Sequence, residues 1–152
     1  MTADTIPKKF LMDVFDQAAR EYPHECCGMI IGPKAKPEEL SRVRPCRNVQ
    51  DEYHARDPEN FPRASKTAYF IDPKELLVVQ KECRENEEDV RVIYHSHIDA
   101  GAYFSEEDKR IAASDGEPAY PGVSYLVVSV IQEKACDAHL FRWDPKEKDF
   151  VG

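Results

Sequence analysis

The stretch of sequence that decides the fold and the chemistry spans residues 90–108 and reads VRVIYHSHIDAGAYFSEED. Its first five residues, Val90–Tyr94, predict a buried strand that leads directly into His95 and His97. Residues two apart on a strand point to the same face, with Cα atoms about 6.6 Å apart. The two imidazoles can therefore converge on one metal ion at the end of the strand.

A metal at this position needs a third ligand, and two carboxylates compete for the role. Asp99 lies two residues after His97 and so continues the every-second-residue spacing, giving His-x-His-x-Asp. This pattern is similar to the start of the metallo-β-lactamase motif, but that motif has a histidine where this chain has Ala100. Asp108 is the better candidate and lies three residues after Ser105, so both project from the first turn of one helix. Taken alone, this pair predicts a capping box, and a carboxylate bound to zinc would not be free to cap.

The complete pattern favours the metal interpretation. Its spacing, His-x-His-x7-Ser-x-x-Asp, resembles the signature of the JAMM (MPN-domain) metalloprotease family at every defining position. The family also has a glutamate just before a glycine-containing apolar strand, and Glu25 precedes such a run at Gly28–Gly32. The resemblance extends from Phe10 to about Trp143, nearly the full chain.

The resemblance implies how the site residues divide the work. Two imidazoles, His95 and His97, and the carboxylate of Asp108 would bind Zn²⁺ and leave its fourth coordination position open, as in catalytic zinc sites. Glu25 would take a proton from water and pass it to the leaving amine. Ser105 would donate a hydrogen bond to the oxyanion, and this use of its hydroxyl would compete with capping.

The resemblance also implies a substrate. Family members cleave after the C-terminal Gly-Gly of ubiquitin or ubiquitin-like proteins, and the small size resembles the stand-alone prokaryotic branch, which is associated with trimming small sulfur carriers. We therefore expect a zinc-dependent peptidase or isopeptidase that acts on a ubiquitin-like sulfur-carrier protein. The alternative is a non-catalytic MPN scaffold that binds proteins, although such modules typically lose metal ligands. A zinc deaminase is disfavoured because its His-x-Glu and Pro-Cys-x-x-Cys elements do not occur here.

One departure from the family pattern affects substrate fit. The residue after the second histidine is usually proline, which would stiffen the loop that leaves the metal, and Ile98 stands there in this chain. Cys26 and Cys27 adjoin Glu25, but small buried residues at the start of a strand explain them better than zinc ligation.

Composition narrows the possible partners and the compartment. With 21 Lys and Arg against 29 Asp and Glu, the net charge is −8, which disfavours general nucleic-acid binding. The sequence has no run long enough to span a membrane, and residues 1–9 contain no apolar segment typical of a secretion signal. The five cysteines include no Cys-x-x-Cys pair, so we expect a reduced, cytoplasmic protein.

The expected fold class is α/β: a single MPN (JAB-like, cytidine-deaminase-like) domain over residues 1–152, with a mixed β-sheet flanked by helices. Helices are expected around 10–19, from Asp72 to about Glu85 with Glu75 as a capping residue, and from Ser105 to Gly116. A long surface loop is expected over 50–66. Strands are expected at 28–32, weakly within 39–49, and at 69–71, 90–94, 124–131, 135–143 and 150–151.

Overall fold

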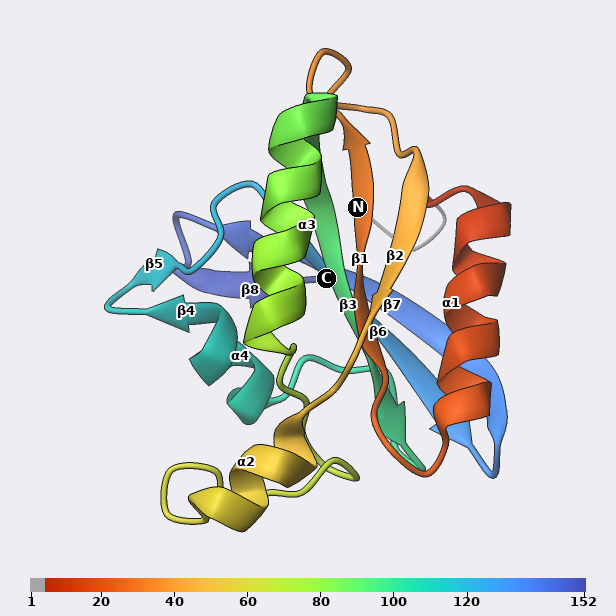
Figure 1. Ribbon diagram of the computed structural model, residues 1–152, viewed down its shortest axis with the longest axis vertical. Coiled ribbons are helices and arrows are strands. Elements are labelled where there is room, and N and C mark those ends of the chain that lie inside the picture. Colours follow the sequence, from red (N-terminus) through yellow and green to blue (C-terminus); the bar gives the residue numbers. More distant parts are fainter. Residues whose placement is uncertain (1–4) are drawn as a thin grey trace.

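A computed structural model describes residues 5–152. The first four residues, which belong to the segment considered above for a secretion signal, lie outside the described residues. Helices and strands interleave along the chain (Figure 1). Their order and bounds are α1 (Lys8–Glu21), β1 (Cys27–Pro33), β2 (Arg42–Cys46), α2 (Gln50–Arg56), α3 (Pro73–Asn86), β3 (Glu88–Ile98), α4 (Glu106–Ala112), β4 (Ala113–Ser114), β5 (Glu117–Pro118), β6 (Ser124–Ile131), β7 (Lys134–Asp144) and β8 (Asp149–Val151). Among residues 5–152, no helix has the length and apolar character that crossing a bilayer requires.

The main sheet is mixed and has the strand order β2-β1-β3-β6-β7-β8. β3 and β6 run parallel, whereas the other neighbouring pairs in this sheet are antiparallel. A parallel pair requires a crossover connection, and here α4 and the small β4–β5 hairpin lie within it. The chain therefore passes from the end of β3 through a short loop into the first turn of α4.

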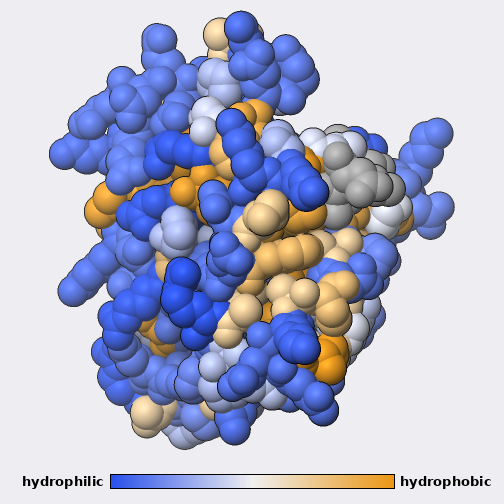
Figure 2. Space-filling view, turned by 90° about the vertical axis from the view of Figure 1, so that its right-hand side faces the viewer, coloured by the Kyte–Doolittle hydropathy of each residue, from blue (hydrophilic) through white to orange (hydrophobic). Residues whose placement is uncertain are grey.

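Helices cover both faces of this sheet. α1 packs on one face through Phe10, Val14 and Ala18. α3 and α4 contribute residues such as Val79 and Ala112 to a second cluster on the opposite face. Figure 1 shows α1 and α3 on either side of the strands. Figure 2 shows the side of the molecule that lies to the right in Figure 1, where a hydrophobic patch is surrounded by hydrophilic residues. The structure confirms the expected α/β class, with a mixed sheet flanked by helices.

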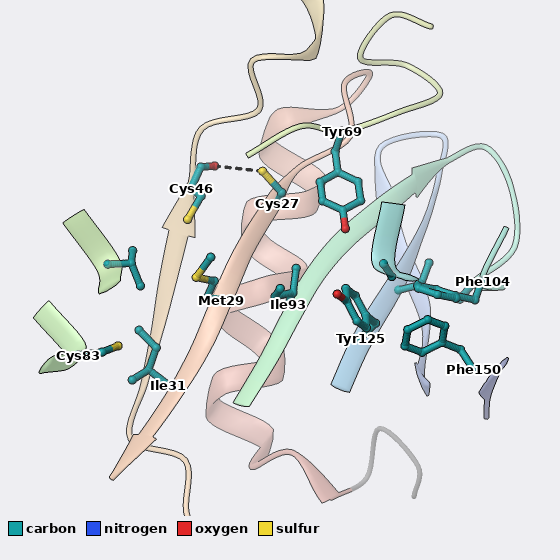
Figure 3. Packing of buried hydrophobic residues seen from close by; sticks show 14 residues of the cluster. Cys27, Met29, Ile31, Cys46, Tyr69, Cys83, Ile93, Phe104, Tyr125 and Phe150 are labelled. Atoms are coloured by element: carbon teal, nitrogen blue, oxygen red, sulfur yellow. Dashed lines mark hydrogen bonds between the residues drawn. The ribbon is translucent and has the colours of Figure 1, made fainter. Parts of the chain in front are cut away.

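Aromatic packing fixes where α4 begins. The ring of Phe104, directly before α4, lies 5.3 Å from that of Tyr125 and 5.0 Å from that of Phe150, centroid to centroid. Figure 3 shows this group beside Met29, Ile93 and the other residues of the α3 and α4 face. Burial of Phe104 anchors the loop after β3 in the core. Phe141 and Trp143, on β7, also pack against this cluster.

Most of the expected elements are present, and two elements differ because of local turn or packing chemistry. The helix predicted to reach Gly116 ends at Ala112, because Asp115 (φ 53°) and Gly116 (φ 76°) form the turn of the β4–β5 hairpin instead. The segment 50–66, predicted to be a loop, contains α2. This short helix forms because Tyr53 packs its ring against Phe61 and Phe70 at 5.0 and 4.9 Å.

Two further expectations fail near α3. Residues 69–71 form no strand, and Ile71 makes only an isolated bridge to Asn48. α3 starts at the expected place, with the side chain of Asp72 accepting a hydrogen bond from the Lys74 N–H at 3.0 Å. Glu75 does not cap this helix, because its carboxylate accepts hydrogen bonds from Arg44 and from the backbone N–H of Arg47.

Gly28 provides a test of the packing between β1 and β3. A Cβ atom added at Gly28 would overlap the ring of Tyr94, which is fully buried and donates its hydroxyl hydrogen bond to Gln17. We expect Gly28→Ala to lower the free energy of unfolding by about 1–3 kcal/mol, the usual cost of overpacking. Urea denaturation followed by circular dichroism measures this change. Gly101→Ala is the matched control, because the nearest atom there lies 3.9 Å away; equal losses in both variants would contradict this account.

Candidate metal centre

The end of β3 and the first turn of α4 bring two histidines and one aspartate together. The Nε2 atom of His95 lies 3.1 Å from Oδ1 of Asp108, and the Nε2 atom of His97 lies 3.1 Å from Oδ2. All three residues are buried, and one potential ligand atom from each lies within 4.8 Å of the others. Within residues 5–152, this is the only group of three or more such side chains close enough to share a metal ion.

The backbone of the loop after β3 orients His97. Its Nδ1 atom lies 2.9 Å from the carbonyl oxygen of Gly101, an arrangement in which Nδ1–H donates to that oxygen. The other ring nitrogen, Nε2, then carries a lone pair directed at a carboxylate oxygen of Asp108. A cation between these two electron-rich atoms satisfies both of them.

His95 has no hydrogen-bond partner at either ring nitrogen within residues 5–152. Its ring stacks on Tyr69, with the centroids 4.4 Å apart, and the side chain is fully buried. Burial lowers the pKa of His95, and the charge of Asp108 only partly opposes this effect. A neutral buried imidazole without a partner is a costly arrangement that a bound metal ion would satisfy.

Asp108 supplies the negative charge of the group. Burial alone would raise its pKa, but the electrostatic interaction with His95, the close approach of both imidazoles and the hydrogen bond from the backbone N–H of Ser105 outweigh burial and lower it. The carboxylate is therefore ionised at neutral pH. Two imidazole nitrogens and one carboxylate oxygen form a donor set that fits Zn²⁺, and no observation on these residues conflicts with such a fit.

Ser105 and Asp108 also form a capping box. The Ser105 N–H donates to Oδ2 of Asp108 at 3.0 Å, and the Asp108 N–H donates to Oγ of Ser105 at 3.0 Å. The capping box and the contacts of Asp108 with both imidazoles occur together, because the carboxylate has enough lone pairs for both. The competition expected for the serine hydroxyl stays a prediction: capping uses an oxygen lone pair, and the hydroxyl proton is left to donate.

Glu25 lies just before β1, and the surrounding backbone holds it in place. Its N–H donates to the carbonyl of Ser65 at 2.7 Å, and its own carbonyl accepts from the side chain of Asn48 at 2.8 Å. The side chain is buried, and its Oε1 atom has no hydrogen-bond partner within residues 5–152. Burial, with a smaller contribution from the charge of Asp108, raises the pKa of Glu25 to about 9, while Arg63 opposes the shift.

One small cavity joins these residues. It has a volume of about 120 Å³ and is lined by Glu25, His97 and Ser105, among others. Glu25 comes from the start of β1, His97 from the end of β3 and Ser105 from the N-terminus of α4, so the fold brings together residues from three elements. One predicted metal ligand, His97, and both predicted catalytic residues therefore face a common space.

Two polar residues close to the histidines in sequence point away from them. Asp99 accepts a hydrogen bond from the Tyr22 hydroxyl at 2.7 Å and another from the Gln132 N–H at 2.9 Å, so it turns away from the imidazoles. Ser96 lies on the opposite face of β3 from the histidines and accepts from the Cys26 N–H at 2.8 Å. Sequence reasoning did not identify Gly101 or Tyr69, because contacts with a loop carbonyl and a stacked ring leave no motif.

Comparison with known proteins agrees with this geometry. The sequence model of a family described as prokaryotic homologs of the JAB domain matches residues 7–144. The chain belongs to this prokaryotic JAB family. JAB domains generally depend on a metal, and in this one the buried His-His-Asp group is a place that could hold it.

Named relatives of this JAB chain include proteins called CysO-cysteine peptidase from Mycobacterium tuberculosis and Mycobacterium bovis. They are 31% identical to it over 112 residues, which covers 74% of this chain and 63% of theirs. The chain thus matches less than two thirds of the length of these relatives. A solved protein from Desulfitobacterium hafniense superposes with a TM-score of 0.67 at 25% identity, covering 95% of this chain and 85% of that one. A protein from Salinibacter ruber shares the fold, with a TM-score of 0.56 at 24% identity over 91% of this chain and 84% of that one.

The buried carboxyl of Glu25 predicts an effect of pH on the stability of the metal-free protein. Because its folded pKa of about 9 lies above its ordinary value of 4.5, the folded state holds a proton that the unfolded state releases. Stability is therefore lost as pH rises between these two values, at up to roughly 1.4 kcal/mol per pH unit. Glu25→Gln carries no such proton, so its stability relative to wild type should rise by a few kcal/mol between pH 5.5 and 8.5.

Urea denaturation in the presence of a chelator measures this difference at the two pH values. Glu59→Gln, at an exposed position in the loop after α2, is the matched control and should follow the wild-type profile. A Glu25→Gln profile parallel to that of wild type would show that this carboxyl is ionised in the folded metal-free protein.

Proposed function

We propose that this JAB-family protein is a zinc-dependent peptidase that hydrolyses the bond after a C-terminal Gly-Gly of a ubiquitin-like sulfur-carrier protein. The observation that carries the proposal is the three-ligand group of His95, His97 and Asp108 beside a cavity shared with Glu25 and Ser105. The printed name of the mycobacterial relatives, CysO-cysteine peptidase, supports both the reaction class and the kind of substrate.

Three protein ligands are typical of a catalytic zinc site, whereas structural sites use four. The two imidazoles and the Asp108 carboxylate would hold the ion, since each offers a donor atom close to the others. The lowered pKa of Asp108 keeps its carboxylate ionised, and the lowered pKa of His95 favours its neutral, metal-binding form. When bound, zinc supplies Lewis-acid polarisation of the scissile carbonyl and increases the acidity of a water molecule. The protein's own residues then have to move the protons and stabilise the developing charge.

Glu25 would act as the proton carrier. In the balanced reaction, the hydroxyl of water ends on the glycine carbonyl carbon, the C–N bond breaks, and the proton ends on the leaving amine. The pKa of Glu25 is about 9 without a cation, and a nearby positive charge lowers the pKa of a carboxyl. Such a group can both accept a proton from water and return it to the amine near neutral pH.

Ser105 would stabilise the oxygen that becomes negative during the reaction. Its Oγ atom already accepts the Asp108 N–H, so the hydroxyl proton is the part of the group that remains available. It lines the same cavity as Glu25 and His97. A hydrogen-bond donor fixed in advance at this point lowers the barrier because it needs no reorganisation during the reaction.

Metal content and cleavage together test the proposal. Elemental analysis should give close to one zinc per chain, and His97→Ala should lose it. Glu25→Gln should retain the zinc but reduce cleavage at least about 100-fold, because proton transfer is lost. Cleavage is measured by mass spectrometry of the host's sulfur carrier, extended by one residue beyond Gly-Gly, before and after incubation.

His139→Ala is the matched control, because this histidine is exposed on β7, where its ring pairs with Asp137, outside the three-residue group. It should retain both zinc and activity. Zinc bound by the wild-type protein without hydrolysis of the carrier would instead favour the non-catalytic scaffold. Full cleavage by Glu25→Gln would remove the proposed role of this residue.

Two substitutions at Ser105 separate its capping from its catalytic use. Ser105→Ala removes the cap and should lower the free energy of unfolding by about 1 kcal/mol, whereas Ser105→Gly should cost only a few tenths. Both remove the hydroxyl, so both should reduce kcat by about 100- to 1,000-fold. Thermal denaturation and initial rates on the carrier measure the two effects. Rates that follow stability across these variants would show that Ser105 acts only as a cap.

A further inference from the structure

Two basic side chains line the cavity that holds Glu25 and Ser105. Arg63 and Lys66 come from the loop that joins α2 to α3, and both are exposed. Neither side chain has an ion pair or hydrogen bond within residues 5–152, whereas Arg42, Arg44 and Arg110 are paired with carboxylates. In a chain of net charge −8, a cavity edge with two unpaired cations favours an anionic ligand.

The loop that carries these cations is held in place. The carbonyl of Arg63 accepts a hydrogen bond from the side chain of Gln50 at 2.8 Å. Between the two cations, Ser65 bonds through its N–H and its hydroxyl to Asp51, each at 2.7 Å, and its carbonyl accepts from the N–H of Glu25. The backbone that presents Arg63 and Lys66 is therefore tied directly to the backbone that presents Glu25. Figure 1 shows α2 and this loop at the end of the sheet where β3 terminates.

We propose that Arg63 and Lys66 bind the free α-carboxylate of a single residue that follows the scissile bond. This inference rests on the proposed peptidase function and adds to it the two residues that would recognise the free end of a carrier extended by one residue beyond Gly-Gly. Cleavage of such a carrier yields the trimmed carrier and one free amino acid.

The dimensions of the site support a leaving group of one residue. An extended residue spans at most about 3.6 Å, so the α-carboxylate of a single residue stays within the cavity that contains the reacting bond. A longer extension would carry its carboxylate out of this space. A lysine joined through its side chain in an isopeptide bond would place a flexible hydrocarbon chain there. The planar guanidinium of Arg63 can also bind a carboxylate through two parallel hydrogen bonds.

A competing explanation is that Arg63 acts only on the neighbouring protein carboxylates. It does oppose the rise in the pKa of Glu25. The pKa of Glu107 is lowered chiefly by the hydrogen bond from Arg110, at 2.6 Å, with a smaller effect of Arg63. If Arg63 served only Glu25, its loss would slow cleavage of every substrate equally. Recognition of a substrate carboxylate instead makes the loss depend on the substrate.

The test compares two forms of one substrate with the zinc-loaded enzyme. The host's sulfur carrier is extended by one alanine after Gly-Gly and prepared by semisynthesis with either a free C-terminal carboxylate or a C-terminal amide. We expect wild type to cleave the free acid with a kcat/KM 10- to 100-fold higher than the amide. The double variant Arg63→Gln/Lys66→Gln should cleave both forms at the rate that wild type shows on the amide.

The control variant Lys8→Gln/Arg20→Gln makes the same change in charge on α1, on the opposite face of the sheet, and should retain the wild-type preference. Equal wild-type rates on acid and amide would overturn the inference while leaving the peptidase function intact. A double variant that is slowed equally on both forms would also overturn it and assign Arg63 to Glu25 alone. No cleavage of either form by wild type would overturn the proposed function and this inference together.

Discussion

The carboxylate of Asp108 interacts with two elements at once, the end of β3 and the first turn of α4, and the arrangement of the site depends on this double role. One of its oxygens faces His95, and the other faces His97 and also accepts the N–H that begins α4. The same residue thus closes a helix terminus and joins it to the end of a strand. The aromatic anchor at Phe104 makes this possible, because it fixes the loop between the two elements in the core.

The site concentrates buried polar groups that are not fully satisfied, and the rest of the fold has to offset their cost. His95 has two ring nitrogens and Glu25 one carboxyl oxygen without hydrogen-bond partners in the described part of the chain. Each such group costs free energy that a well-packed apolar residue would not. The two hydrophobic clusters, one on each face of the sheet, provide the stabilising free energy that offsets this cost. Unsatisfied buried groups gathered around one site are the pattern expected where a ligand completes the structure.

Much of the fold and of the candidate site could be predicted from the sequence, because the information was local. The spacing of His95, His97, Ser105 and Asp108 lies within one short stretch, and the strand at Ser124–Ile131 is largely apolar. The errors arose where distant residues decide the outcome. α2 depends on aromatic contacts with Phe61 and Phe70. The Glu75 carboxylate does not cap α3, because it accepts hydrogen bonds from arginines on and next to β2. The positions of Arg63 and Lys66 follow from loop hydrogen bonds that no motif encodes.

The three potential metal ligands lie close together in the sequence, whereas Glu25 lies far from them. His95, His97 and Asp108 are close in sequence, so a chain segment containing only β3 and α4 needs little loop entropy to bring them together. Glu25 arrives only through the antiparallel pairing of β1 with β3, in which Cys27 lies opposite His95. A partly folded chain that contains only β3 and α4 could therefore already bind the proposed metal ion. The proposed peptide hydrolysis also requires β1 to be paired with β3.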